Sequence, residues 1–370
     1  MRIKTIGIFT LIIAGSLTAE DSYVISQQGF FRVQGIHQSY TIDNDSSLSE
    51  FSMPIEVYWP ISRETSLSLY TSYANAAGNN LTEVSGLSDT QISWNYYLEN
   101  QNLVFNLGLG MPTGKTALDS LEFQTSLFIS QYYWNFTVPS FGQGFNLSPG
   151  ITWAIPLSDA AVMGLGLSYQ FRGGFLPVKY TEDVYKPGNE VLLTGGLDLR
   201  LGRLSTLSGD IIFNSYGPDT YADTMEVYKS GNKLVTSVQF KNYYTHDLLF
   251  LSFRYRSKAK SQIIDRNSAT GTYELIAERE KSYPNHIELT GWYKHRHSVS
   301  FFMSYGLEGR FYEETGIYKG SKLISIVLAP EIKLSNRSRL SGKLKYWTGS
   351  YSTDVPLSGL EIGAGWMVLF

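Results

Sequence analysis

The sequence predicts an all-β protein, a transmembrane antiparallel up-and-down β-barrel of 14–16 strands with a helical segment in one long extracellular loop. Three observations support this fold class. Apolar residues recur at every second position in many segments, short and long polar connections alternate along the chain, and the final alternating segment ends on an aromatic residue, Phe370.

The N-terminal segment is typical of an export signal. A short basic start precedes an apolar core from Ile6 to Leu17, and Ala19 offers a small residue at the expected cleavage point. This apolar stretch is shorter than the ~20 residues that a helix needs to cross a bilayer. We expect residues 1–19 to be a signal peptide and residues 20–370 to form a single outer-membrane β-barrel domain. An uncleaved N-terminal anchor is the alternative.

Alternation of period two defines the strands. Leu103, Phe105, Leu107, Leu109 and Met111 are apolar, whereas the residues between them are mostly small or polar. This period places the two sets on opposite faces of a strand. Segments of about ten residues suit tilted strands that cross ~25 Å of hydrocarbon. The expected strands are 29–41, 51–60, 65–75, 90–98, 102–111, 144–155, 160–172, 190–202, 205–215, 233–243, 246–258, 284–294, 298–311, 321–334, 338–348 and 358–370, and loss of one hairpin leaves 14.

Short polar turns alternate with long polar connections between these strands. Such alternation is typical of outer-membrane barrels, in which the short turns are periplasmic and the long loops extracellular. An even strand number then places both termini on the periplasmic side. The expected long connections are 76–89, 112–142, 173–189, 216–232, 259–283, 312–320 and 349–357.

The last segment carries a further signal, because Leu360, Ile362, Ala364, Trp366, Val368 and Phe370 alternate with small or polar residues. It resembles the final strand of bacterial outer-membrane barrels, which implies recognition by the barrel-insertion machinery. Aromatic rings near strand ends favour the membrane–water interface. The expected girdle residues are Tyr58, Trp59, Trp153, Trp292, Tyr293, Tyr346 and Trp347, with core packing as the alternative for each.

Charged residues fall opposite the apolar set within the strands. An Arg or Lys in mid-membrane on the lipid face would cost roughly 2–4 kcal/mol, so we expect these residues to line the lumen. They are Arg172, Asp198, Arg200, Asp210, Lys241, Arg254, Arg256, Glu288, Glu308, Arg310, Glu331, Lys333, Lys343 and Lys345. Acidic strands between basic ones predict a polar conduit with a transverse field. The alternative is a set of ion pairs that only hold wall and loops together.

The longest connection, Pro112 to Gly142, has helical periodicity. Leu118, Leu121, Phe128 and Tyr132 fall on one helical face, with Asp119 near its start. We expect this segment to fold into the barrel mouth as a constriction. A surface loop with a helical turn is the alternative.

Several functions are not expected. The chain has no Cys, which excludes thiol nucleophiles and Cys-ligated zinc, and a net charge of −3 gives no basic field for nucleic acid. His295 and His297 stand in a basic turn, which favours solvated charge over metal ligation. We therefore expect no catalytic, cofactor or metal site, no nucleic-acid partner and no enzyme activity.

A resemblance covers about 40 residues. Gly86-Leu87-Ser88-Asp89-Thr90, followed by Leu107 to Lys115 (LGLGMPTGK), resembles outer-membrane proteins named for the MetA pathway of phenol degradation, relatives of the long-chain fatty-acid transporter barrels. Tyr185-Lys186-Pro187-Gly188-Asn189-Glu190 looks like another element of such barrels, although Asp would be expected where Asn189 stands. The resemblance implies a channel for uptake of small, aromatic or apolar compounds.

The sequence thus predicts a monomeric channel in the outer membrane of a Gram-negative bacterium, for passive uptake of small molecules, including hydrophobic or aromatic ones. Its expected partners are outer-membrane lipid, small-molecule solutes and the insertion machinery. A structural or surface-interaction barrel with a plugged lumen is the alternative.

Overall fold

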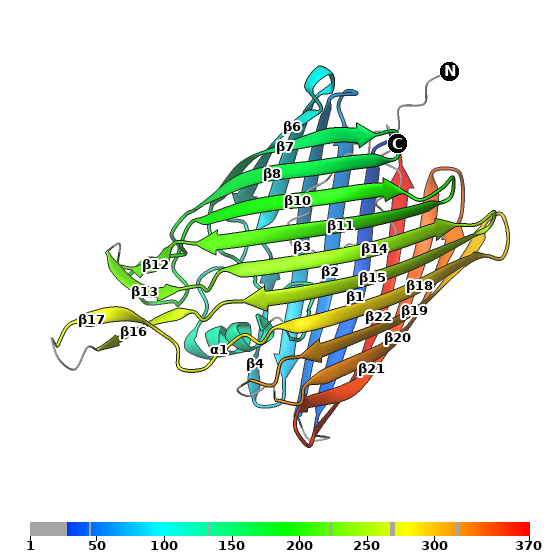
Figure 1. Ribbon diagram of the computed structural model, residues 1–370. Coiled ribbons are helices and arrows are strands. Elements are labelled where there is room, and N and C mark those ends of the chain that lie inside the picture. Colours follow the sequence, from blue (N-terminus) through cyan, green and yellow to red (C-terminus); the bar gives the residue numbers. More distant parts are fainter. Residues whose placement is uncertain (1–27, 44–45, 132, 223, 267–270, 316–318) are drawn as a thin grey trace.

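A computed structural model describes residues 28–370 apart from 44–45, 132, 223, 267–270 and 316–318, so the expected signal peptide lies outside the described residues. Sixteen antiparallel strands close into a barrel, which confirms the expected fold class (Figure 1). The wall strands are β1 (Phe30–Ile42), β2 (Ser46–Pro60), β3 (Thr65–Gly78), β5 (Thr90–Leu98), β6 (Leu103–Met111), β7 (Asn146–Ser158), β8 (Ala161–Arg172), β10 (Glu190–Arg200), β11 (Ser205–Tyr216), β14 (Lys233–Tyr243), β15 (Asp247–Lys258), β18 (His286–Arg296), β19 (Phe301–Tyr312), β20 (Lys322–Lys333), β21 (Ser338–Ser352) and β22 (Val355–Leu369).

The first and last strands close the wall. β1 pairs with β22 in one antiparallel register, from Phe30 opposite Leu369 to Ile42 opposite Leu357. At the end of this seam, the Gly29 N–H donates to the Phe370 carbonyl at 3.0 Å. Unpaired backbone groups in hydrocarbon cost several kcal/mol each, so this pairing is what allows the sheet to lie in a membrane.

The pairing register assigns each side chain to one face of the wall. Leu251 and Phe253 on β15 are 46% and 41% exposed and point outward, whereas Arg254 lies on the opposite, interior face. In the described wall strands, outward-facing Asp, Glu, Lys and Arg are confined to Asp247 and Lys322, each the first residue of its strand. The outer surface is therefore the apolar face that hydrocarbon requires.

Of the expected girdle residues, Trp153 and one residue of each neighbouring pair lie on the outer face, whereas the other residue of each pair lies inside. Trp59, Trp153, Tyr293 and Tyr346 are exposed on the outer face. Trp347 is instead buried inside, where its ring lies 5.1 Å from that of Tyr40. Tyr58 and Trp292 also fall on the interior face. Successive residues of a strand point to opposite faces, so two adjacent aromatics cannot both face lipid.

The wall extends further at one end than the expected strands do. β4 (Leu81–Leu87) pairs with the last part of β3, after which β5 takes over the pairing with the first part. β21 and β22 continue to a turn at Thr353–Asp354, so the expected long connection over 349–357 is wrong. Polar residues of this stretch, such as Ser350 and Ser352, are paired within the wall, so their polarity does not mark a loop.

Five short strands form a second sheet that projects from one end of the barrel (Figure 1). They are β9 (Tyr185–Lys186), β12 (Pro218–Tyr221), β13 (Met225–Lys229), β16 (Gln262–Arg266) and β17 (Tyr273–Ala277). The Tyr185 hydroxyl donates to the Asp219 carboxylate, and burial together with this bond raises the pKa of Tyr185. The Gly188 N–H donates to the same carboxylate at 2.7 Å. These bonds join β9 to β12 within the second sheet, and Asn189 Oδ1 of the same motif accepts from the Arg172 N–H of β8 at 3.0 Å, which ties the motif to the wall.

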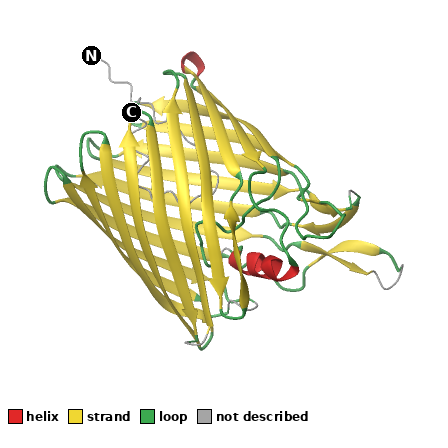
Figure 2. Cartoon of the chain, turned by 180° about the vertical axis from the view of Figure 1, so that it is seen from behind, coloured by secondary structure: helices red, strands yellow, loops and turns green. Residues whose placement is uncertain are grey.

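The two ends of the barrel differ. The end that carries the second sheet and the helix α1 (Ser120–Ile129) is called the loop end, and the end that carries η2 (Glu99–Gln101) and the C-terminus is called the turn end (Figure 2). The described helices include none with the length and apolar character to cross a membrane.

A charge placed on the outer face tests this sidedness. We expect Leu251→Arg to lower the free energy of unfolding by about 2–4 kcal/mol, because the guanidinium would enter hydrocarbon. Ser252→Arg, on the next residue and the interior face, should cost far less. Urea unfolding in lipid vesicles measures both, and equal losses would contradict the register.

Candidate functional site: the barrel interior and its inner loop

The helix α1 begins where the sequence places a cap. The Asp119 carboxylate accepts from the Leu121 and Glu122 N–H groups at 3.0 and 2.8 Å, and the Glu122 carboxylate accepts from the Asp119 N–H at 3.1 Å. This reciprocal arrangement is a capping box, which satisfies the free donors of the first turn. Lys115 Nζ lies 2.5 Å from Glu122 Oε1 and ties the helix start to the preceding chain.

The chain that follows α1 lies against the inner wall. Here the inner loop means residues 112–145, between β6 and β7. The Val138 N–H donates to Glu50 Oε1 at 3.0 Å, the Thr137 N–H to Gln38 Oε1 at 3.0 Å, and the Tyr133 hydroxyl to the Ser350 carbonyl at 2.9 Å. The buried residues around these bonds are Tyr40, Leu48, Ala74, Ala76, Val84, Leu118, Ile129, Tyr133, Trp134, Phe136, Val138, Phe141, Tyr312, Leu323, Trp347 and Leu357.

This packing confines the inner loop to one side of the barrel. Its wall partners come from β19 to β22 and from β1 to β4, which are neighbours around the closed sheet. Tyr40 illustrates the density of the contact, since its hydroxyl donates to the Trp134 carbonyl and its ring meets the Trp134, Phe136 and Trp347 rings within 5.4 Å. The described inner loop is therefore a fixed part of the core.

The expected constriction face is only partly the packed face. Leu118 is buried and Phe128 packs against the buried cluster, but Leu121 is 58% exposed, so the expectation is wrong for Leu121. Tyr132 lies outside the described residues. Thr125 makes the contact with the wall instead, and its hydroxyl donates to the Thr82 carbonyl of β4 at 2.7 Å. An apolar periodicity could not reveal this polar contact.

Asp89 fastens both ends of the inner loop. Its carboxylate accepts from the Gly114 N–H at 2.9 Å, where the loop leaves β6, and from the Gln143 N–H at 2.6 Å, where the loop returns. The Thr90 N–H donates to the Thr113 hydroxyl oxygen at 2.8 Å across the same joint. We call this contact the Asp89 clamp.

The glycines of the first resemblance motif fit the same joint. A Cβ on Gly114 would lie 2.1 Å from the Phe141 carbonyl oxygen, and one on Gly86 would lie 3.0 Å from Lys115 Cβ. Both positions need glycine, because backbone atoms or the first carbon of a neighbouring side chain occupy the space that a Cβ would fill. The two halves of the motif, far apart in sequence, thus meet at the Asp89 clamp.

The expected lumen-lining residues share one face. The pairing register places Arg172, Asp198, Arg200, Asp210, Lys241, Arg254, Arg256, Glu288, Glu308, Arg310, Glu331, Lys333, Lys343 and Lys345 on the face opposite the exposed apolar residues. The same face also carries charged residues that the sequence analysis missed, namely Arg32, Glu50, Glu56, Glu190, Lys233, Lys258, Lys294, Arg296, Arg339 and Glu361. Most of them lie within the expected strands, so the alternation identifies them too.

Ion pairs on this face run along the wall. Lys343 Nζ lies 2.6 Å from Glu361 Oε1 on the neighbouring strand, and Arg254 Nη1 lies 3.1 Å from Glu288 Oε2 on its neighbour. Lys345 on β21 extends across β20, and its Nζ lies 2.5 Å from Glu308 Oε2 on β19. These pairs join strands that are adjacent or one apart, so they brace the wall without crossing the lumen.

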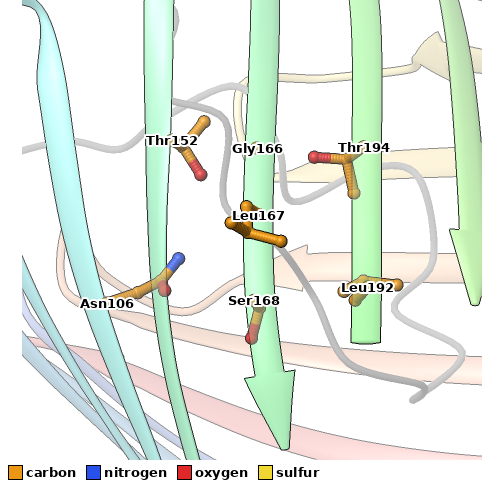
Figure 3. Close-up of a pocket in the computed structure, with 7 residues that line it drawn as sticks. All are labelled: Asn106, Thr152, Gly166, Leu167, Ser168, Leu192 and Thr194. Atoms are coloured by element: carbon orange, nitrogen blue, oxygen red, sulfur yellow. The ribbon is translucent and has the colours of Figure 1, made fainter. Parts of the chain in front are cut away.

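The middle of the wall from β6 to β10, between the charged residues near the strand ends, has a different lining of small neutral residues. Figure 3 shows a shallow depression there, lined by Asn106, Thr152, Gly166, Leu167, Ser168, Leu192 and Thr194. A Cβ on Gly150 would lie 2.1 Å from Asn106 Oδ1, and one on Gly166 would lie 2.4 Å from Thr194 Oγ1. The polar side chains therefore lie flat over glycines instead of projecting into the lumen.

No metal centre is apparent. The described residues contain no group of three or more His, Asp or Glu side chains placed to hold a metal ion. His295 Nδ1 lies 2.6 Å from Asp247 Oδ1, and its ring lies 4.5 Å from that of His297. This contact joins β18 to β15 at the turn end.

Comparisons with known proteins identify the fold. No family model and no curated protein sequence matches the chain. Among solved structures, CdiB from Acinetobacter baumannii is similar with 12% identity and a TM-score of 0.52, covering 92% of this chain and 60% of that chain. OprB from Pseudomonas putida is similar with 9% identity and a TM-score of 0.50, covering 93% and 94%.

A third structure, the toluene transporter TbuX from Ralstonia pickettii, aligns with 7% identity and a TM-score of 0.47, covering 94% and 90%. The fold and the apolar outer face define an outer-membrane-type β-barrel. The resemblance to the MetA-pathway proteins stays a prediction.

The Asp89 clamp can be tested by substitution. We expect Asp89→Ala to lower the free energy of unfolding by about 1–3 kcal/mol, since two backbone donors lose their acceptor. Hydrogen exchange should also become faster in residues 115–142. Asp159→Ala, an exposed carboxylate in a short turn, is the matched control and should change neither measurement. Unchanged exchange in Asp89→Ala would show that the clamp does not hold the loop.

Proposed function

We propose that this protein is an outer-membrane channel for passive movement of small solutes, with the loop end outside the cell and the turn end in the periplasm. The observation that carries this proposal is the one-sided packing of the inner loop. Its partners lie on β19–β22 and β1–β4, whereas the wall from β5 to β18 keeps a polar interior face. A polar face within an apolar outer surface is the arrangement of a water-filled conduit.

Barrel size supports the same proposal. With sixteen strands, side chains from the wall alone cannot fill the lumen. The inner loop narrows it from one side and is held there by backbone hydrogen bonds to Gln38 and Glu50. We therefore propose that the inner loop sets the diameter of the channel as a fixed constriction. Apolar and aromatic solutes are included in the proposed substrates on the motif resemblance.

The second sheet favours one further candidate function. It projects from the loop end, where Tyr273 is 69% exposed, and it would stand clear of the membrane surface. A surface-interaction barrel would use this sheet to bind a partner. Such a barrel, with a plugged lumen, would not conduct, and deletion of the sheet would abolish binding of its partner. A channel would conduct both with and without the sheet.

Side-specific labelling tests the conduit directly, because the chain contains no Cys. Gln239→Cys places a thiol on the interior face of β14, and Val238→Cys places one on the outer face. A charged, water-soluble thiol reagent should reduce the planar-bilayer conductance of Gln239→Cys by about half or more. Val238→Cys should not respond. A barrel without conductance, or with equal responses, would refute the channel.

The inner loop provides a second test. Deletion of residues 117–131 removes α1 and its contact with β4. We expect single-channel conductance to rise about twofold, because the deletion widens the narrowest part of the conduit. The shift between folded and unfolded bands on a gel controls for correct folding. An unchanged conductance would show that the inner loop does not constrict the channel.

A further inference from the structure

Basic residues gather on the interior face at the loop end. Lys233 on β14 stands directly opposite Lys258 on β15, and Arg256 lies one interior position further along β15. Arg172 on β8 is also close enough to Lys233 to act on it electrostatically, as are Arg256 and Lys258. We call Arg172, Lys233, Arg254, Arg256 and Lys258 the basic belt.

This arrangement costs stability. Like charges directly opposite each other on one face of a sheet are destabilising. The acids close to the belt are Glu190, which lies 2.5 Å from Arg172, Glu288, which lies 3.1 Å from Arg254, and Asp219 and Glu278, which act electrostatically on Lys258. The five bases of the belt therefore outnumber these four acids. A concentration of charge that destabilises the fold is expected where a ligand of opposite charge compensates it.

The part of the inner loop from Phe123 to Phe145 supplies no opposing charge. Residues 123–145 contain no Asp, Glu, Lys or Arg. This segment packs on β19–β22 and β1–β4, the part of the wall away from β8, β14 and β15. The packed part of the inner loop therefore adds no acidic group opposite the belt. The acids of the inner loop, Asp119 and Glu122, cap the start of α1 and pair with Lys115.

Aromatic side chains accompany the basic belt. Tyr216 is the register partner of Glu190 and lies close to Arg172 and Arg256. The Lys258 ammonium lies 4.8 Å from the centroid of the Tyr283 ring. Arg and Lys side chains form strong charge-assisted hydrogen bonds with carboxylates, and tyrosine rings offer apolar contact area beside them.

We propose that the basic belt is a binding step for small organic carboxylates on their way through the channel. The belt lines the entrance from the loop end, so carboxylates meet it before the inner part of the lumen. This inference deepens the proposed function, because it names anionic solutes as the preferred class. Rings of Arg and Lys are the usual basis of anion preference in pores.

The test measures ion selectivity and ligand binding in parallel on the full-length protein. The reversal potential in a KCl gradient gives the permeability ratio of anions to cations, and isothermal titration with benzoate gives binding in detergent. We expect the wild type to prefer anions and to bind benzoate better than benzyl alcohol. In K233Q/R256Q/K258Q, the permeability ratio should fall about threefold to tenfold and benzoate binding should be lost.

A matched control separates the belt from charge in general. R200Q/R296Q/K333Q removes the same number of interior-face bases at the turn end. It should leave benzoate binding unchanged and shift the permeability ratio by less than about twofold. Removal of the Lys233–Lys258 repulsion should not impair folding of the belt variant, which the gel shift checks.

The two readouts separate the two proposals. If the barrel does not conduct but still binds benzoate through the belt, the channel proposal is refuted and the carboxylate site is supported. If the barrel conducts but prefers cations, the carboxylate site is refuted and the channel is supported. The same conclusion follows if the belt and control variants have equal effects on selectivity and binding. Benzoate and benzyl alcohol bound equally well would also refute the carboxylate site.

Discussion

Backbone hydrogen bonding in hydrocarbon is the constraint on which the rest of this structure depends. Every N–H and C=O group in the membrane needs a partner, and the seam between β1 and β22 provides the last row of partners. Once the sheet is closed, alternation divides the side chains into an apolar outer set and a mostly polar inner set. All functional chemistry is thereby confined to the interior face and to the connections.

That constraint also explains why so much of the fold could be predicted from the sequence. Period-two alternation marks a strand and assigns its faces at the same time, so the bounds of β5 and β14 were predicted to the residue. The error over Trp347 came from grouping it with Tyr346 at the interface, although the same alternation puts the two rings on opposite faces.

Features built from long-range polar contacts could not be predicted. The sequence shows that Asp89 and Gly114 belong to a recurring motif, but it does not show that they are in contact. Their contact depends on the point at which the partner of β3 changes from β4 to β5. The second sheet consists of short strands without clear alternation. Lys233 and Lys258 stand at strand ends, where the pattern is weakest, and only the register shows that they face each other.

The Asp89 clamp has a consequence for how such a barrel can change over evolutionary time. Both ends of the inner loop are secured by one carboxylate that belongs to neither end, so the intervening chain behaves as an insert mounted on a rigid frame. Substitutions, insertions or losses between these two anchor points need not disturb any strand pairing. Pore calibre and solute preference can then diverge among descendants while the transmembrane scaffold is conserved.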